Sequence, residues 1–520
     1  MSRELAESLD LNLAWRRIIF DRPDRVFTSH PYLIELVELD LPDWLNRINQ
    51  RIIEGYNPSS CLALNVPKSD WQIRPGGYLR LDDEIVYAAL IGSCYETISR
   101  SIHWSQGDPD IAYQLPIEAD RAEWVRRGYL IWREWREKSI ERLHRGAEFI
   151  LFADISAFYE NIDLDRLASD LRRMHLNDEA RVLLSSCLHR WAHPRGKGIP
   201  QGYSASDIIA KVYLEPVDRT LRNDGFDHLR YVDDIRVFCR DFRQAKKALL
   251  RLTELLRNRG LNIQSAKTKI VRADLAIHEI DGITPIIHAI LRDLQEEIRE
   301  GYDLGAYATV ADLELLAEAH PEHPPVEVLE RAFRDHFVDA TDAFDKTLFH
   351  FLLTRLGAAS SACARDYCVG LLGLKPEETE YILKYLGRIG LTEIDQNRII
   401  AYLNSPEAIY EYQIFQILRH FYQHDFNLEE ILQFCRSIMH NGEFAPWVKH
   451  YAIALLGKGG SPADLEQLEA FYQESSDSLQ RATLICSSCQ MERDRRNAFL
   501  GRVRDDGWLE EKAARWVRLH

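Results

Sequence analysis

The chain has 520 residues, 46% of them hydrophobic and 28% charged, a balance that is typical of a folded globular protein and excludes a disordered one. It contains no apolar run close to the ~20 residues that a membrane-spanning helix needs. The N-terminal segment lacks the apolar core of a secretory signal, and the nine cysteines are scattered along the chain, which favours reduced thiols. We therefore expect a cytoplasmic protein with no membrane contact.

The negative charge lies mainly in the C-terminal part of the chain, and the formal net charge of the whole is −16. Residues 1–300 hold 43 Lys and Arg against 47 Asp and Glu, whereas residues 301–520 hold 22 against 34. Proteins that grip a nucleic-acid duplex usually carry a basic surface, because they must neutralise its phosphates. The composition therefore argues against a duplex-binding role for the C-terminal part.

Residues 1–285 combine strand-like and helix-like segments. Strands are expected at 149–155 (FILFADI), around the pair Asp233-Asp234, at 261–271 and at 283–291. Helical stretches such as 163–176 (DLDRLASDLRRMHL) lie between them. This alternation predicts an α+β domain.

Residues 286–520 have an almost purely helical pattern. Prolines at expected first turns mark helix starts at Pro376, Pro406 and Pro462, and apolar residues follow at intervals of three and four. Successive helix pairs without a strict sequence repeat predict a HEAT-like helical array, with a plain helical bundle as the alternative. We expect the domain boundary between residues 280 and 325 and place it after residue 285.

Three aspartates are the strongest candidates for chemistry. Asp154 ends the first strand, and Asp233 and Asp234 lie side by side in a predicted hairpin, where a strand interior would tolerate them poorly. Carboxylates that meet at strand ends repel one another unless divalent cations lie among them, and oxygen-only ligands favour Mg²⁺ or Mn²⁺. Two such ions about 3.5–4 Å apart can activate an attacking oxygen and stabilise a leaving oxygen in phosphoryl transfer. The pattern therefore predicts a nucleotidyl-transfer site.

The order FADISAFY, GIPQG, YVDD and LNIQSAKTKI resembles the palm motifs of reverse transcriptases, and YVDD at 231–234 matches their Y-x-D-D signature. The resemblance covers about residues 60–275. It implies a nucleotidyltransferase whose right-hand-polymerase fingers and palm, an antiparallel sheet with helices, occupy residues 1–285 together with an N-terminal extension. The helical domain at 286–520 follows this unit.

The resemblance also implies roles for individual residues. It assigns Asp154, Asp233, Asp234 and the backbone carbonyl of Ile155 to two Mg²⁺ ions, for which Mn²⁺ can substitute. The implied nucleotide-binding residues are Arg74 and Arg80 in the fingers, Tyr159 as the bulky residue that favours dNTPs, Gln201 and Gly202 beside the nascent pair, and Lys267, with Lys269 as an alternative, near the pyrophosphate. After PQG the chain departs from the pattern, because it reads YSASD where templated members commonly have a Ser-Pro-containing continuation.

A fingers–palm unit joined to a long acidic helical domain resembles the abortive-infection (Abi) polymerases of bacteria and their phages. That resemblance implies polymerisation of dNTPs without a template, priming on a tyrosine of the protein, a single-stranded DNA product covalently attached to it, a homo-oligomer and a role in phage defence. Tyr32 is the candidate priming residue, ahead of Tyr56. Two alternatives stay open: a templated RNA-directed DNA polymerase of another bacterial defence or retron-like system, and a degenerate palm that serves as a binding scaffold.

Overall fold

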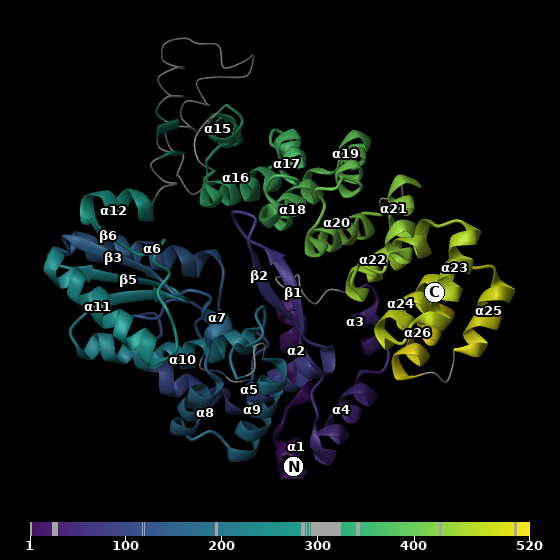
Figure 1. The fold of residues 1–520 in the computed structure, drawn as a ribbon, viewed down its shortest axis with the longest axis horizontal. Coiled ribbons are helices and arrows are strands. Elements are labelled where there is room, and N and C mark those ends of the chain that lie inside the picture. Colours follow the sequence, from purple (N-terminus) through teal and green to yellow (C-terminus); the bar gives the residue numbers. More distant parts are fainter. Residues whose placement is uncertain are drawn as a thin grey trace. The chain divides into compact units, whose positions relative to one another are not determined.

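A computed structural model of the chain describes residues 3–22, 30–116, 118, 120–192, 196–281, 286–287, 289–290, 292, 324–339, 344–425, 429–503 and 507–520. Figure 1 shows the helices and strands of the chain, coloured along the sequence. The chain divides into two compact units. The palm unit comprises Met1–Ser29, Pro42–Leu64 and Pro75–Asp281, and the helical unit comprises His30–Leu41, Asn65–Arg74 and Gly282–His520. The boundary that we placed after residue 285 stays a prediction, since residues 282–285 lie outside the described part. Among the described helices, none combines the length and apolar character required to span a bilayer.

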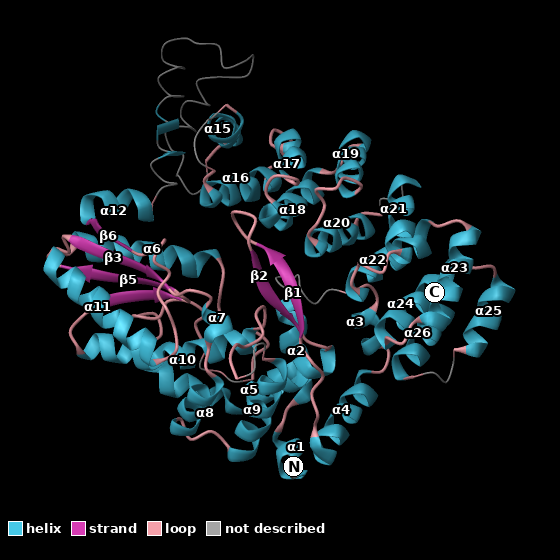
Figure 2. Cartoon of the chain, viewed as in Figure 1, coloured by secondary structure: helices cyan, strands magenta, loops and turns pink. Residues whose placement is uncertain are grey.

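The centre of the palm unit is a four-stranded antiparallel sheet with the strand order β4-β5-β3-β6 (Figure 2). Its strands are β3 (Phe149–Asp154), β4 (Asp227–Tyr231), β5 (Asp234–Cys239) and β6 (Lys269–Arg272). The register of β3 and β5 runs from Phe149 opposite Cys239 to Asp154 opposite Asp234. The two central strands are therefore in step along their whole length and end together.

Helices contact the sheet in two groups, and the strand sequences reflect this. α6 (Tyr129–His144) and α12 (Ala273–Ile280) pack on a core that includes Ile150, Leu229 and Phe238. α11 (Phe242–Asn258) contacts β3, β5 and β6. Leu151 and Val237, which alternate with these residues, are also fully buried. Strands covered on both faces read as almost continuous apolar runs, as FILFAD does.

The palm unit also contains the helices around this sheet and a separate two-stranded hairpin. The helices are α1 (Arg3–Ser8), α2 (Leu11–Asp21), α4 (Leu41–Gly55), α5 (Leu81–Ile102), α6 (Tyr129–His144), α7 (Phe158–Asn161), α8 (Leu164–Arg173), α9 (Asp178–Trp191), α10 (Ser204–Asn223), α11 (Phe242–Asn258) and α12 (Ala273–Ile280), and the hairpin strands are β1 (Leu62–Pro67) and β2 (Ile73–Tyr78). The tip of the hairpin groups with the helical unit. At its base, a Cβ on Gly77 would lie 2.9 Å from the Cα of Pro200, so only glycine lets β2 approach the turn before α10 this closely.

The described part of the helical unit contains helices and the hairpin tip. Its helices are α3 (Leu33–Glu38), α15 (Val326–Phe333), α16 (Lys346–Ala358), α17 (Arg365–Leu371), α18 (Thr379–Ile389), α19 (Glu393–Leu403), α20 (Glu411–Gln423), α21 (Glu429–His440), α22 (Pro446–Gly459), α23 (Pro462–Glu474), α24 (Ser478–Cys486), α25 (Arg493–Arg502) and α26 (Trp508–Leu519). Helices α16, α18, α20, α22, α24 and α26 each contact the next one in this series, and α17, α19 and α21 form a second row. This two-row order is that of a stacked helical array; its HEAT-like class stays a prediction.

Three expectations about local structure were wrong. The strand predicted at 261–271 begins only at Lys269, because hydrogen bonds from Lys267 to Gln264 and from Thr268 to Ser265 fold the preceding residues into turns. The described residues within 283–291 are helical, not extended. Pro406 does not start a helix: the turn is closed by a hydrogen bond from the Ala408 amide to the Ser405 carbonyl, and the next helix begins at Glu411.

We expect Asp464→Ala to lower the free energy of unfolding by about 1–2 kcal/mol, measured by urea unfolding of the full chain. Asp464 forms a capping box with Ser461 at the start of α23 and also accepts hydrogen bonds of 2.6 and 2.9 Å from Arg436. The bonds from Arg436, with those from Ser461, outweigh burial and lower the Asp464 pKa from 3.8 to about 2. The contribution of Asp464 to the free energy of unfolding should thus be complete above pH 3.8 and be lost as the pH falls through 2.

The matched control is Asp366→Ala, which removes a carboxylate that is 91% exposed in its ion pair with Arg398. Such pairs contribute at most about 1 kcal/mol. Equal destabilisation by the two substitutions would contradict the capping role of Asp464.

Candidate active site

Three carboxylates are held at one end of the palm sheet by backbone pairing. Asp154 ends β3 opposite Asp234, the first residue of β5. Asp233 lies in the two-residue turn between β4 and β5, and its carbonyl accepts a hydrogen bond of 3.2 Å from the Ile155 amide. Asp154 and Asp234, which are 80 positions apart in the sequence, therefore adjoin in the sheet.

The carboxylates influence one another electrostatically. Burial, followed by the charges of Asp234 and Asp154, raises the pKa of Asp233 from 3.8 to about 6. Burial and the charge of Asp154 also raise the pKa of Asp234. Both shifts mean that ionising Asp233 and Asp234 costs free energy, which nearby positive charge would offset.

Lys267 supplies one such charge. Its Nζ lies 2.6 Å from Asp154 Oδ2, while Lys269 pairs with Glu279 on α12 at 2.7 Å. Partial burial alone would lower the pKa of Lys267, but the hydrogen bond and charge of Asp154, with the charges of Asp234 and Asp233, raise it. Of the two lysines that the sequence offered, Lys267 is the one placed beside the carboxylates.

The donor atoms fit a hard divalent cation. After β3, the Ser156 amide donates a hydrogen bond to the Asn262 carbonyl, and the Gln264 amide donates one to the Asp154 carbonyl. Within the described residues, the Ile155 carbonyl accepts no backbone hydrogen bond. This leaves a backbone oxygen beside two adjoining carboxylates, a set that suits Mg²⁺ or Mn²⁺. No group of three or more His, Cys, Asp and Glu side chains in the described ranges is gathered tightly enough to hold a metal by itself.

The turn that carries Asp233 is strained. Val232 has φ of +59°, a left-handed conformation that a β-branched residue rarely adopts. Arg230 stabilises the turn from within, because its guanidinium donates a hydrogen bond of 3.0 Å to the Val232 carbonyl. Arg230 therefore holds the turn that carries Asp233, and sequence analysis missed this contact although Arg230 stands directly before YVDD.

A buried ionic network fixes Arg230 in turn. Its guanidinium bonds Asp218 at 3.0 and 2.7 Å and Asp110 at 2.7 Å, and Lys211 also lies 2.7 Å from Asp110. Burial alone would raise the pKa of Asp218, but the charge of Arg230 and the hydrogen bonds from His228 and Arg230 lower it to about 2. The Asp218 carboxylate thus stays ionised and holds the arginine in place.

A second polar cluster, which sequence analysis also missed, fixes Tyr159. The Tyr159 hydroxyl donates a hydrogen bond of 2.9 Å to Asp207 Oδ1 in the first turn of α10. Arg127 lies 3.9 Å from the other oxygen of Asp207 and also pairs with Asp21 at 2.7 Å. Burial and the charge of Asp207 raise the pKa of Tyr159, so its phenol stays protonated. The signal in the sequence was the departure YSASD, whose last residue is Asp207.

The other predicted nucleotide-binding residues lie in different places. Gln201 and Gly202 form the turn before α10, next to β2. Arg80 is the exposed residue before α5 in the palm unit, whereas Arg74 belongs to the hairpin tip in the helical unit. Their roles stay predictions.

The two candidate priming tyrosines are both packed. Tyr32, in the helical unit, is half-buried against Tyr422 and Trp516, and burial raises its pKa. Tyr56 is buried, and its hydroxyl donates a hydrogen bond of 2.7 Å to Asp83. The priming role of Tyr32 stays a prediction.

Comparison with known proteins names the class of this site. Residues 100–308 match the sequence profile of the family described as reverse transcriptase (RNA-dependent DNA polymerase), so this segment is a nucleotidyltransferase domain of the reverse transcriptase family. Polymerases of this family generally use divalent metal ions, in agreement with the oxygen donors at the ends of β3 and β5.

Individual relatives share only part of the chain. The Retron Ec48 reverse transcriptase of Escherichia coli is 30% identical over 155 residues, which make up 28% of this chain and 36% of that protein. The chain thus covers about a third of this relative's length. Among solved structures, telomerase from Candida albicans with a TWJ fragment of telomeric RNA matches 77% of this chain and 70% of its own at 12% identity and a TM-score of 0.33. The corresponding Candida tropicalis complex matches 70% and 68% at 11% identity and a TM-score of 0.34.

We expect Arg230→Leu to destabilise the full chain by about 3–5 kcal/mol in urea unfolding, because it leaves Asp218 and Asp110 buried without their main counter-charge. Arg240→Leu, at an exposed position just after β5, is the matched control and should change the stability by less than about 0.5 kcal/mol. A stable Arg230→Leu protein would show that the network does not depend on this arginine.

Proposed function

We propose that the chain is a DNA polymerase of the reverse transcriptase family in which Asp154, Asp233 and Asp234 perform two-metal nucleotidyl transfer. The observation that carries this proposal is the register of β3 and β5, which sets Asp154 opposite Asp234 with Asp233 in the adjoining turn. The match of residues 100–308 to the reverse transcriptase family supports it.

Each residue of the site has a part in this reaction. The three carboxylates and the Ile155 carbonyl are proposed to hold two Mg²⁺ ions, for which Mn²⁺ can substitute. Bound there, the ions supply the charge that activates the attacking hydroxyl and stabilises the leaving pyrophosphate. The attacking oxygen forms a bond to the α-phosphorus of the dNTP, and the bond to pyrophosphate breaks. Lys267, whose Nζ lies 2.6 Å from Asp154 Oδ2, is proposed to meet the negative charge of the leaving group.

The nucleotide is proposed to be selected at its sugar. The Tyr159 ring stands five residues after Asp154, and Asp207 fixes its hydroxyl. A ring held in one orientation can bar a 2′-hydroxyl by contact, which favours dNTPs. Gln201 and Gly202 are proposed to border the nascent pair, and Arg74 and Arg80 to contact the triphosphate.

We further propose that polymerisation is template-independent and protein-primed, as in the abortive-infection polymerases that defend bacteria against phages. The acidic composition of residues 301–520 supports this, because an acidic surface repels a product duplex. In this proposal the cytoplasmic protein forms a homo-oligomer and carries its single-stranded DNA product covalently on a tyrosine, with Tyr32 as the first candidate.

The second candidate function is templated RNA-directed DNA synthesis in a retron-like system. The observation that favours it is the 30% identity with Retron Ec48 reverse transcriptase over 155 residues. The two candidates differ in one requirement, since only the second needs an RNA template.

Incubation of the purified protein with dNTPs and Mg²⁺ alone distinguishes the two. We expect covalently attached DNA of mixed sequence, and mass spectrometry of the labelled peptide should identify the priming residue. Asp233→Asn with Asp234→Asn should reduce incorporation by at least about 1,000-fold, since it removes two metal-binding charges. Product that forms only after a template and primer are added would overturn the untemplated mechanism and favour the retron-like one.

Substitutions at Tyr159 test the sugar-selection role. Tyr159→Ala should raise incorporation of rNTPs relative to dNTPs by at least about tenfold, because the ring no longer fills the space of the 2′-hydroxyl. Tyr159→Phe is the matched control, since it keeps the ring and removes only the hydrogen bond to Asp207. Unchanged discrimination in Tyr159→Ala, measured as the ratio of kcat/KM values, would rule out this role.

A further inference from the structure

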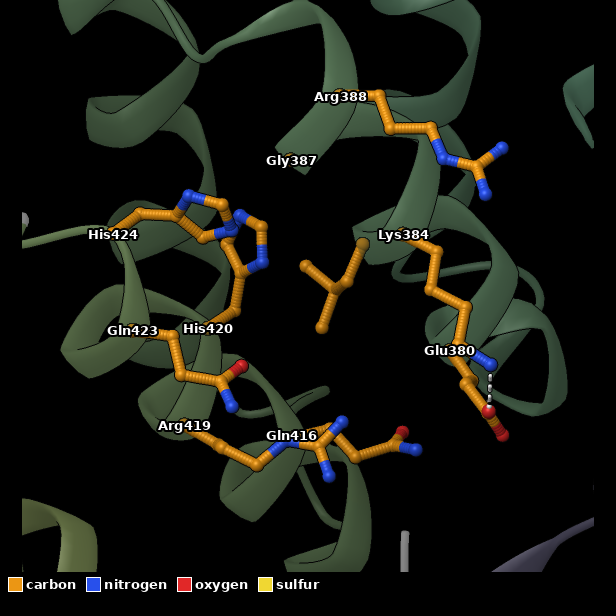
Figure 3. Close-up of a pocket in the computed structure, with 10 residues that line it drawn as sticks. Glu380, Lys384, Gly387, Arg388, Gln416, Arg419, His420, Gln423 and His424 are labelled. Atoms are coloured by element: carbon orange, nitrogen blue, oxygen red, sulfur yellow. Dashed lines mark hydrogen bonds and ion pairs between the residues drawn. The ribbon is translucent and has the colours of Figure 1, made fainter. Parts of the chain in front are cut away.

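The helical unit contains a polar groove between α18 and α20, which Figure 3 shows in close-up. Its volume is about 260 Å³. The lining residues are Glu380, Leu383, Lys384, Gly387 and Arg388 from α18, and Gln416, Arg419, His420, Gln423 and His424 from α20 and its C-terminal end. We call this feature the α18–α20 groove.

The groove is built by one face of each helix. On α18 the lining residues follow Glu380 by three, four, seven and eight positions. On α20 they follow Gln416, which is 36 positions after Glu380, by the same intervals, so each set lies on one face of its helix. Neighbouring helices of a stacked array usually meet through apolar side chains. Here Gln416 and His420 are only 4% and 5% exposed although both are polar. Burying polar groups along a helix contact costs free energy, so it points to a use other than packing.

Gly387 makes room for the imidazoles that line one side. A Cβ at this position would lie 2.8 Å from His424 Nε2 and 3.2 Å from His420 Cε1. The two rings lie side by side, with centroids 4.4 Å apart. The absence of a side chain at residue 387 therefore keeps the groove open at the level of both histidines.

The groove is positive within an acidic region. Lys384 is paired with Glu380 at 2.7 Å, which leaves Arg388 and Arg419 as the excess charge. Among the described residues, the side chain of Arg419 has no hydrogen bond or ion pair, and the side chain of Arg388 donates one hydrogen bond of 3.2 Å to the Thr354 carbonyl. Burial, then the charges of His424 and Arg419, lower the pKa of His420 to about 3, as expected where further positive charge is unfavourable.

We propose that the α18–α20 groove binds a phosphate group, with Arg419 and Arg388 as its charged ligands and the imidazoles and glutamines as hydrogen-bonding partners. Guanidinium groups form the strongest, often paired, hydrogen bonds with phosphate oxygens. The volume lies just below the about 300–1,000 Å³ of sites for drug-sized ligands, which fits a pyrophosphate or a single nucleotide. The phosphate comes either from a free nucleotide or pyrophosphate, or from the backbone of a single strand.

The groove site does not rest on the proposed polymerase activity. All its residues belong to the helical unit, and none of them is among the carboxylates or their partners. It can therefore be tested in a full-length protein with Asp233→Asn and Asp234→Asn, where nucleotide binding through metal ions at the palm is removed. Chelator in the buffer excludes divalent ions as well.

Isothermal titration calorimetry on this background uses three probes: pyrophosphate, dTTP and an oligothymidylate of about ten nucleotides, a length within the range of single-strand sites. We expect at least one probe to bind, and Arg419→Ala to weaken its binding by at least about tenfold, as loss of a charge-assisted hydrogen bond requires. Binding of pyrophosphate and dTTP identifies free phosphate compounds as the source. Binding of the oligonucleotide alone identifies the strand backbone.

Arg398→Ala is the matched control, because Arg398 is an arginine of the same unit whose partner is the exposed Asp366. The Arg398→Ala substitution should leave the affinity for the probe within about twofold of that of the background protein, because Arg398 is not among the residues that line the groove. Arg419→Lys, which keeps the charge, should recover part of the affinity and excludes misfolding as the cause of the loss. Absence of binding for all three probes, or equal affinities in Arg419→Ala and Arg398→Ala, would overturn the proposal.

Discussion

Like-charge repulsion at one end of the palm sheet is the constraint on which the rest of the site depends. The registers of β3 with β5 and of β4 with β5 bring Asp154, Asp233 and Asp234 to the same edge, and burial strengthens their mutual effect. Backbone pairing brings the three carboxylates together in spite of their repulsion. Positive charge, from the protein's own side chains or from a bound cation, must therefore offset that repulsion. Lys267 meets part of this need at Asp154, and the open Ile155 carbonyl adds an oxygen that suits a cation.

The hairpin that carries two of the aspartates is held by an ionic network whose net contribution to stability is small, although removal of one partner leaves a buried charge unpaired and is costly. Buried ion networks such as Arg230 with Asp218 and Asp110 lose much of their Coulombic gain to desolvation. Their effect here is positional, because the same guanidinium binds the carbonyl of the left-handed Val232. The second cluster, Asp207 with Tyr159 and Arg127, acts in the same way on the ring that faces the sugar in our proposal.

The sequence was most informative where chemistry and local pattern coincide. FILFAD as a strand, the hairpin around Asp233 and the helical texture after residue 324 are all present in the described residues, because apolar runs and spacing of three and four are local signals. The clusters around Arg230 and Asp207 were missed, because their partners are up to 120 positions away and polar residues carry no periodicity. For the same reason nothing in the sequence indicated that His30–Leu41 and Asn65–Arg74 group with the helical unit.

Metal binding by the palm carboxylates is the central claim, and Mn²⁺ titration followed by electron paramagnetic resonance tests it most directly. In the presence of a dNTP, the full-length protein should bind two Mn²⁺ ions, and the variant with Asp233→Asn and Asp234→Asn should lose this binding. The same Mn²⁺ stoichiometry and affinity in the variant would contradict the account, because the aspartates would then have no part in holding the ions.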